Sequence, residues 1–296
     1  MRRGILAVAT LVAALACGGP EAVTVGSKDF VEQDVLAELV SQELEERGIP
    51  VERRFHFGGT DITHEALKSG AIDLYVEYSG TALVAILDRA PIHDADSVYT
   101  VVEETYLERW DLVLGPVLGF ENTFALVVRR ADADSLDLEA ISDLARVDER
   151  WTAGFGPEFM SREDGYPGLR RAYDLEFESV KQMDLGLLYR ALEQGQIDVA
   201  VGNSTDGQIA ALDLVVLEDD RDFFPPYQAV PVVRRETLES HPPVWDVLQS
   251  LERTISTEQM RELNRRVVGE GVDIPKAVRR WRATHLGDAG EPTVDR

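Results

Sequence analysis

The sequence has few of the features that identify catalytic or nucleic-acid-binding proteins. It contains one cysteine, Cys17, so no disulfide can form within the chain. Bases are scarce: 30 Lys and Arg stand against 54 Asp and Glu, and the net charge is −24. Because phosphate binding needs a basic surface, this charge argues against a nucleic-acid-binding protein.

Motifs of the common enzyme classes are also missing. There is no G-x-S-x-G turn, no G-x-x-x-x-G-K-[ST] phosphate loop and no G-x-G-x-x-G dinucleotide loop. His64-Glu65 begins like a zinc-protease helix, but Lys68 stands where the second histidine is required. The five histidines follow no metal-binding spacing, and they are His56, His64, His93, His241 and His285. We therefore expect no enzyme, no catalytic residue, no metal site and no cofactor, and we interpret His64 as structural.

Long apolar runs are absent except at the start of the chain. Two arginines precede Gly4–Ala16, an apolar stretch shorter than the roughly 20 residues that span a bilayer as a helix. Cys17 follows at once, and the pattern resembles a bacterial lipoprotein signal. We predict a signal peptide at residues 1–16, lipid attachment at Cys17 and a linker at residues 17–22. The alternative is an ordinary cleaved signal with an incidental cysteine.

Strand and helix patterns alternate in the rest of the chain. In the first part they fall at Val23–Val25, Phe30–Arg47, Val51–Phe57, Asp61–Ser69 and Ile72–Tyr78. This β-α-β-α-β order predicts a parallel, doubly wound sheet. A second run of the same kind begins at Trp151, so we expect an α/β protein with two such units.

The two runs resemble each other in sequence. Residues 65–74 parallel residues 190–199, and in that register Tyr78 falls opposite Asn203. We interpret this likeness as a duplicated sheet domain whose matching loops face one cleft. The alternative is that helix–glycine–strand units look alike in any α/β protein.

A further pair of similar segments, Ala125–Arg130 and Val230–Arg235, brackets the second run. If the chain crosses between domains at each segment, the second domain is inserted into the first, and the two crossings form a hinge beside a cleft. The predicted division is a first lobe of residues 23–124 and 231–286, a second lobe of residues 125–230, and a flexible tail of residues 287–296.

Polar loops follow several of the predicted strands. Open α/β sheets bind ligands at the carboxyl ends of their strands, and this rule selects Ser27–Asp29, Gly58–Thr60, Tyr78–Thr81, Phe155–Glu158 and Asn203–Asp206. Their short polar groups and few aromatic rings suit the holding of a small polar molecule better than catalysis.

Several motifs resemble the osmoprotectant class of substrate-binding proteins, which serve ABC importers for glycine betaine, carnitine and choline. The similar segments, in chain order, are Val25–Gln33, His64–Leu67, Asp73–Thr81, Glu121–Leu126, Gly154–Phe159, Arg162–Gly165, Ser204–Gly207 and Phe223–Tyr227. The resemblance runs from about residue 23 to about residue 286. It implies a type II periplasmic-binding fold, with two α/β lobes joined by two crossing strands.

The resemblance also implies a site in which aromatic rings surround a quaternary ammonium group through cation–π attraction. The implied ligand contacts are Lys28, Tyr78, Thr81, Phe124, Arg162, Asn203 and Tyr227. Among them, Phe124 stands where the family often has Tyr. Asn203 occupies a commonly aromatic position, so one wall of the box is lost.

Charged residues have implied roles as well. Lys28 and Arg162 match positions that hold a ligand carboxylate and join the lobes. Glu158 and Asp164 match acids that help to fix the closed state.

These features predict an extracytoplasmic protein that captures a glycine betaine-like ligand by hinge closure and delivers it to an ABC permease with its ATPase. We expect a monomer that contacts the membrane only through its N-terminal lipid. Asn203 leaves open a different betaine or polar osmolyte, such as choline, carnitine or ergothioneine. A ligand-sensing module is a further alternative. A two-lobed enzyme is disfavoured because no nucleophile–base pair is found.

Overall fold

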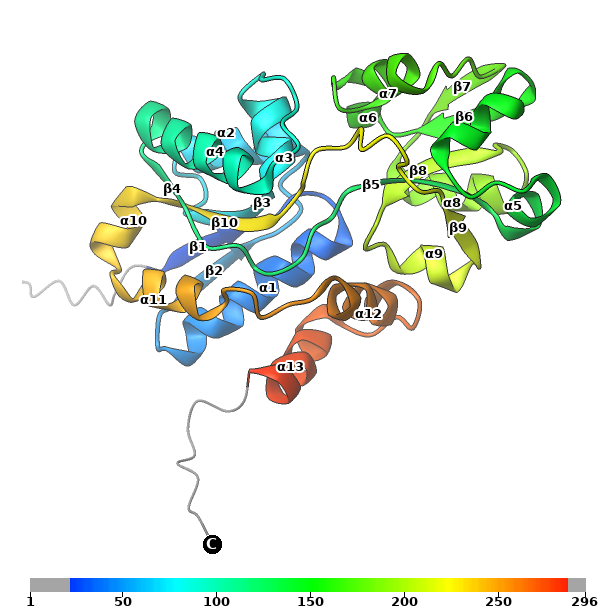
Figure 1. Ribbon diagram of the computed structural model, residues 1–296. Helices are drawn as coiled ribbons and strands as arrows, with labels where there is room; N and C mark the ends of the chain where they lie inside the picture. Colours follow the sequence, from blue (N-terminus) through cyan, green and yellow to red (C-terminus); the bar gives the residue numbers. More distant parts are fainter. Residues whose placement is uncertain (1–21, 287–296) are drawn as a thin grey trace, which may run out of the picture.

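The computed structural model describes residues 22–286, which form two five-stranded sheets flanked by helices (Figure 1). The strand order is β2-β1-β3-β10-β4 in the first sheet and β7-β6-β8-β5-β9 in the second. This arrangement confirms the predicted α/β class with two units. The predicted signal peptide, Cys17 and the predicted tail lie outside the described residues.

In the first sheet four strands run in one direction, and β10, between β3 and β4, runs in the other. Its strands are β1 (Val23–Gly26), β2 (Val51–Arg54), β3 (Leu74–Tyr78), β4 (Leu112–Leu114) and β10 (Ala229–Arg234). Its helices are α1 (Val31–Glu46), α2 (Thr60–Lys68), α3 (Ser79–Thr81), the π-helix η1 (Ala82–Ile86), α4 (Ala95–Trp110), α10 (Arg235–Ser240), α11 (Pro243–Ser250), α12 (Thr257–Val268) and α13 (Ile274–His285). Alternate residues of β3 enter opposite layers of the core, since Val76 packs with α1 and Tyr75 packs with α4.

The second sheet repeats this design. Its strands are β5 (Phe124–Arg129), β6 (Thr152–Phe155), β7 (Ser179–Gln182), β8 (Val199–Asn203) and β9 (Leu214–Val216). Its helices are α5 (Arg130–Leu136), the 3₁₀ segments η2 (Ile141–Arg146) and η3 (Asp148–Arg150), α6 (Pro157–Ser161), α7 (Tyr166–Tyr173), α8 (Leu185–Glu193) and α9 (Gly207–Ala211).

Matching details support an internal duplication. Asp73 accepts a hydrogen bond from the backbone N–H of Thr24 at 2.8 Å, and Asp198 accepts one from Thr152 at 2.9 Å. Tyr78 and Asn203 end the equivalent strands β3 and β8, as the predicted register requires. Loops at corresponding strand ends therefore carry corresponding positions of the two units.

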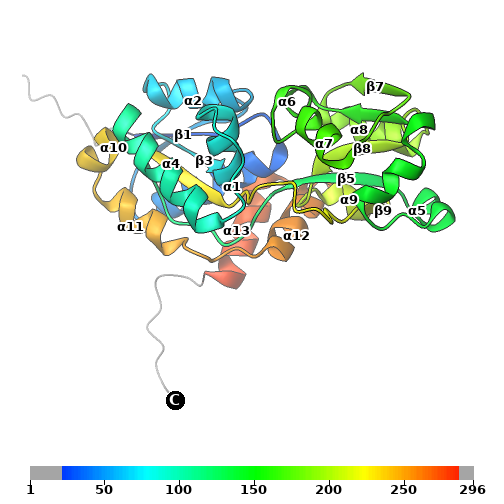
Figure 2. The same ribbon diagram turned by 45° about the horizontal axis from the view of Figure 1, so that its top comes forward.

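The chain passes between the sheets along the two segments that lead into β5 and β10. These segments pair through a bridge between Glu121 and Gln228, and they run side by side between the two lobes in Figure 2. Strand pairing in the second sheet already includes Phe124, and pairing in the first sheet begins at Ala229. These positions lie one and two residues before the predicted lobe boundaries at residues 125 and 231, and the exact division of the lobes stays a prediction.

Helix α12 contacts both lobes, although the predicted division places it entirely in the first. It packs against α1 and also against α9 of the second lobe. A Cβ atom added to Gly207 would lie 2.5 Å from the backbone nitrogen of Arg265, so glycine permits this close approach. The guanidinium of Arg261 also donates to the carbonyl of Ser204 at 2.8 Å.

Close packing against each sheet requires a glycine in the second strand of the sheet, which is β1 in the first lobe and β6 in the second. A Cβ atom on Gly26 would lie 2.5 Å from Cδ1 of Ile72, and Gly154 is equally crowded by Ile197. We expect Gly26→Ala to lower the free energy of unfolding by about 1–3 kcal/mol, because the buried core must shift. Urea unfolding would measure this loss.

Removing the obstructing methyl group should restore part of that stability. We expect the double variant with Ile72→Val to be more stable than Gly26→Ala alone. Gly186→Ala is the matched control, because nothing lies within 4 Å of its added Cβ. An unchanged midpoint in Gly26→Ala would show that the contact does not limit packing.

Candidate ligand-binding site

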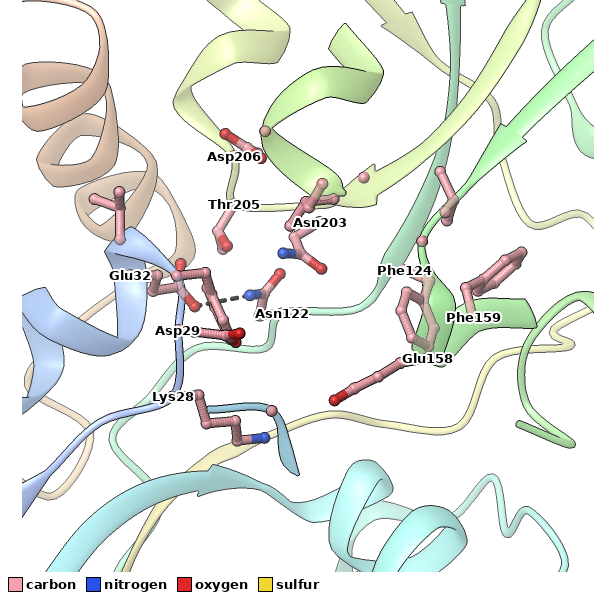
Figure 3. Close-up of a pocket in the computed structure, with 18 of the residues that line it drawn as sticks. Lys28, Asp29, Glu32, Asn122, Phe124, Glu158, Phe159, Asn203, Thr205 and Asp206 are labelled. Carbon is pink, nitrogen blue, oxygen red and sulfur yellow. Dashed lines mark hydrogen bonds between the residues drawn. The ribbon is translucent and has the colours of Figure 1, made fainter. Parts of the chain in front are cut away.

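A cavity of about 760 Å³ lies between the two lobes (Figure 3). Its walls are the segments that follow β1, β2, β3, β6, β7 and β8, together with residues of both crossing segments and of α12. Both sheets thus present the carboxyl ends of their parallel strands to one space, which is where open α/β sheets bind ligands.

Every residue predicted from the sequence as a ligand contact lines this cavity, namely Lys28, Tyr78, Thr81, Phe124, Arg162, Asn203 and Tyr227. Glu158 lines it as well. Asp164 does not line it, because it is fully buried next to Arg162. The geometry therefore gathers these side chains, and their roles in binding stay predictions.

Arg162 is held by a two-pronged ion pair. Its Nε and one terminal nitrogen donate to the two oxygens of Asp164 at 2.8 and 2.5 Å. Burial alone would lower the pKa of Arg162, but the bonds to Asp164 outweigh it and the pKa is raised above its usual value. Arg162 is thus fully charged in the cavity wall.

The same ion pair joins the two lobes. Both terminal nitrogens of Arg162 donate to the hydroxyl oxygen of Thr81 at 3.3 Å. The hydroxyl of Tyr227, which lies beside β10, donates to Asp164 at 2.6 Å. A third contact lies at the cavity wall, where the backbone N–H of Thr60 donates to Glu158 at 3.0 Å.

Lys28 is buried and its charge is balanced within the first lobe. Its ammonium group forms an ion pair with Glu77 and donates to the hydroxyl oxygen of Thr60 at 3.2 Å. The same nitrogen lies 5.3 Å from the ring centroid of Tyr78. A ligand carboxylate at this position would share Lys28 with Glu77, as it would share Arg162 with Asp164.

Aromatic rings collect where the crossing segments meet the cavity. Phe124 packs edge-on against Tyr227, with ring centroids 5.7 Å apart, and against Phe159 at 4.9 Å. On the first lobe, Tyr78 stacks with Phe30 at 6.3 Å. Phe30 and Phe159 line the cavity but were not among the predicted contacts.

A buried carboxylate, Glu32, organises the polar part of the cavity (Figure 3). It accepts hydrogen bonds from the hydroxyl of Tyr78 at 2.6 Å, the amide of Asn122 at 2.8 Å and the amide of Asn264 at 2.7 Å. Burial raises the pKa of Glu32, and the side chain of Thr205 opposes the shift together with these three donors. The sequence did not predict this cluster, because its members lie on α1, a crossing segment and α12.

His64 lies outside the cavity lining. It is buried on α2, with its ring 4.6 Å from Trp110 and 5.2 Å from Tyr106. Burial lowers its pKa from 6.5 to about 4, with a smaller contribution from nearby Lys68. The side chain therefore packs as a neutral ring.

The two sheets of matching topology, the double crossing and the cavity between facing strand ends define a two-lobed solute-binding protein of the type II periplasmic-binding class. A family model described as the substrate-binding domain of the ABC-type glycine betaine transport system, OpuAC, matches residues 21–284. The chain belongs to this family. Substrate-binding proteins of ABC importers bind small molecules outside the cytoplasm and work with a permease. Within residues 22–286, no helix has the length and apolar character to cross a membrane.

Named relatives include binding proteins for several ligands. The chain is 33% identical to the glycine-betaine-binding protein of Pseudomonas aeruginosa, over 94% of this chain and 95% of that protein. It is 35% identical to the carnitine transport binding protein OpuCC of Listeria monocytogenes, over 82% of this chain and 80% of that protein. It is also 37% identical to an ergothioneine transport permease/binding protein, EgtU, of Helicobacter pylori; the match covers 83% of this chain but only 44% of that longer protein.

A solved structure agrees in fold. A crystal structure described as a glycine betaine/carnitine/choline ABC transporter superposes with a TM-score of 0.76 at 32% identity, covering 90% of this chain and 99% of that one.

His64 should make stability depend on pH. Because folding lowers its pKa from 6.5 to about 4, the unfolded chain binds the proton more tightly. The free energy of unfolding of wild type therefore falls by up to about 3 kcal/mol as the pH decreases from 6.5 to about 4. His64→Phe has no titrating ring at this position, so its free energy of unfolding lacks this contribution.

Urea unfolding between pH 4 and pH 8 would test this expectation. The free energy of unfolding of wild type should fall more steeply below about pH 6.5 than that of His64→Phe. Parallel curves for the two proteins would contradict it.

Proposed function

We propose that this protein captures a quaternary ammonium compound outside the cytoplasm and delivers it to an ABC permease and its ATPase. The observation that carries the proposal is the set of aromatic rings at the cavity, with Tyr78 in the first lobe, Phe124 in the second and Tyr227 beside the second crossing. A trimethylammonium group has no N–H to donate, so ring faces attract it better than hydrogen-bond acceptors do.

The charged side chains would complete the site. Lys28 and Arg162 would attract a ligand carboxylate, each in competition with the acid that it already contacts. The family and the named relatives support glycine betaine, carnitine, choline and ergothioneine as candidate ligands. The protein would make and break no bond in the ligand.

Capture would proceed by closure of the two lobes. Ligand binds one lobe, the crossing segments bend, and contacts between the lobes enclose it. The contacts of Thr60 with Glu158 and of Thr81 with Arg162 favour this closed arrangement. Further parts of the proposal are lipid attachment at Cys17 and a monomeric state.

The ring of Phe124 should contribute to ligand affinity through cation–π attraction as well as by filling space. We expect Phe124→Leu to weaken choline binding by about 0.5–2 kcal/mol, measured by calorimetry, because leucine fills space without attracting a cation. Phe177→Leu is the matched control, since Phe177 packs in the second lobe outside the cavity lining.

A neutral analogue tests the same attraction from the ligand side. 3,3-Dimethyl-1-butanol has the shape of choline without its charge, and it should bind at least about tenfold more weakly. Equal binding of the two compounds would exclude cation–π recognition.

Glu158 should stabilise the closed arrangement of the lobes through its hydrogen bond with the backbone N–H of Thr60. We expect Glu158→Ala to weaken ligand binding by about 0.5–1.5 kcal/mol and to enlarge the radius of gyration of the ligand-free protein in X-ray scattering. Glu163→Ala is the control, because Glu163 pairs with Arg171 inside the second lobe. If both variants bind like wild type, the contact with Thr60 does not stabilise closure.

A further inference from the structure

Two exposed apolar residues occupy equivalent positions of the duplicated units. In the register that aligns residues 65–74 with residues 190–199, Ile62 of α2 falls opposite Leu187 of α8. They are 58% and 53% exposed, more than any other large apolar residue that the structure describes. Single exposed apolar side chains are common on protein surfaces, but exposure of the same position in both units indicates a shared use.

The structure supports this alignment of the two helices. Apart from Thr60, the buried residues of α2 are Thr63, His64, Ala66 and Leu67, and those of α8 are their equivalents Leu188, Tyr189, Ala191 and Leu192. Ile62 and Leu187 precede this buried face in the first turn of each helix. The likeness therefore extends from the sequence to the way in which the two helices pack.

Both residues lie where the cavity opens. Strands β2 and β7, which precede α2 and α8, are the end strands of their sheets, and two strands separate each of them from β10 or β5. The crossing segments lead into β10 and β5 and pair with each other on that side of the cavity. The side at α2 and α8, which lie in different lobes in Figure 2, is thus free to open and close. Thr60 and Gly186 line the cavity directly before Ile62 and Leu187.

An exposed acid accompanies each apolar residue. Asp61 lies beside Ile62 in the first turn of α2, and Asp184 immediately precedes α8. Neither carboxylate has an ion-pair or hydrogen-bond partner within residues 22–286. Each lobe therefore presents an apolar side chain next to an uncompensated negative charge, and the matching surface is an apolar recess next to a basic residue.

We propose that Ile62 and Leu187, with Asp61 and Asp184, form a two-part surface that docks on the permease of the importer. The inference rests on the proposed function, because delivery of a ligand requires contact with the permease. One part lies on each lobe, so closure of the lobes sets the distance between the two parts. A permease surface with two apolar recesses, each beside a basic residue, would contact both parts together only at the spacing of the closed lobes. Docking would then favour the loaded protein over the empty one.

Stimulation of ATP hydrolysis tests this surface. The permease–ATPase complex is reconstituted in nanodiscs and titrated with the protein in a saturating mixture of glycine betaine, carnitine, choline and ergothioneine. We expect Ile62→Gln and Leu187→Gln each to raise the half-maximal protein concentration about tenfold, because each removes an apolar contact of the docked state. Calorimetry with the four compounds should give affinities within about twofold of wild type, since neither residue lines the cavity.

Matched controls come from the same class of exposed residues. Leu107 on α4 and Leu136 on α5 are 40% and 37% exposed and lie outside the cavity lining, so Leu107→Gln and Leu136→Gln should stimulate like wild type. Asp61→Lys should weaken docking about as much as Ile62→Gln, because it places a positive charge against a basic partner surface. Wild-type stimulation by both Ile62→Gln and Leu187→Gln would overturn the docking surface, as would an equal loss in the two controls.

Two further outcomes separate this inference from its alternatives. A wild-type protein that dimerises in analytical ultracentrifugation, together with monomeric Ile62→Gln and Leu187→Gln, would overturn the inference by showing that a second copy of this chain occupies the surface. Failure of the wild-type protein to bind any of the four compounds would overturn the proposed function itself.

Discussion

The buried ion pair of Arg162 with Asp164 is the interaction on which the arrangement of the two lobes depends. A buried charge that loses its partners is costly, so each group in such a cluster must keep its hydrogen bonds. Here the remaining partners, Thr81 and Tyr227, come from the first sheet's side of the cleft. The two charges pair with each other within the second lobe, but their remaining hydrogen bonds form only when that lobe lies against the first, which couples this ion pair to closure.

The two matching sheets form the framework of the cavity, and the residues that differ between them at equivalent strand ends give the cavity its chemistry. Equivalent strands β3 and β8 end in Tyr78 and Asn203, and both residues reach the same cavity. One half thus offers an aromatic face, while the other offers a short amide beside Thr205. The two halves therefore present unlike side chains at equivalent positions of one cavity.

Local sequence patterns predicted the sheets and the residues at strand ends, because period and turn signals lie within a few neighbouring positions. They therefore predicted Tyr78 and Asn203 at the cavity, whereas Arg162 was predicted only from the resemblance to the family. They did not predict Glu32 or Asn264, whose hydrogen bond joins residues 232 positions apart. Glu32 lies in the first turn of α1, a helix that is buried along most of its length, and its bond to Asn264 depends on the packing of α12 against α1.

Glu32 connects three separate elements at the cavity. Its carboxylate accepts from the hydroxyl of Tyr78 at the end of β3, which turns that ring's polar edge toward Glu32. The same carboxylate accepts from Asn122 of the first crossing segment and from Asn264 of α12. Because buried polar groups must keep their hydrogen bonds, one side chain on α1 holds these three elements in register. Removing this carboxylate would therefore leave three buried donors unpaired at once, whereas loss of one donor would remove a single contact.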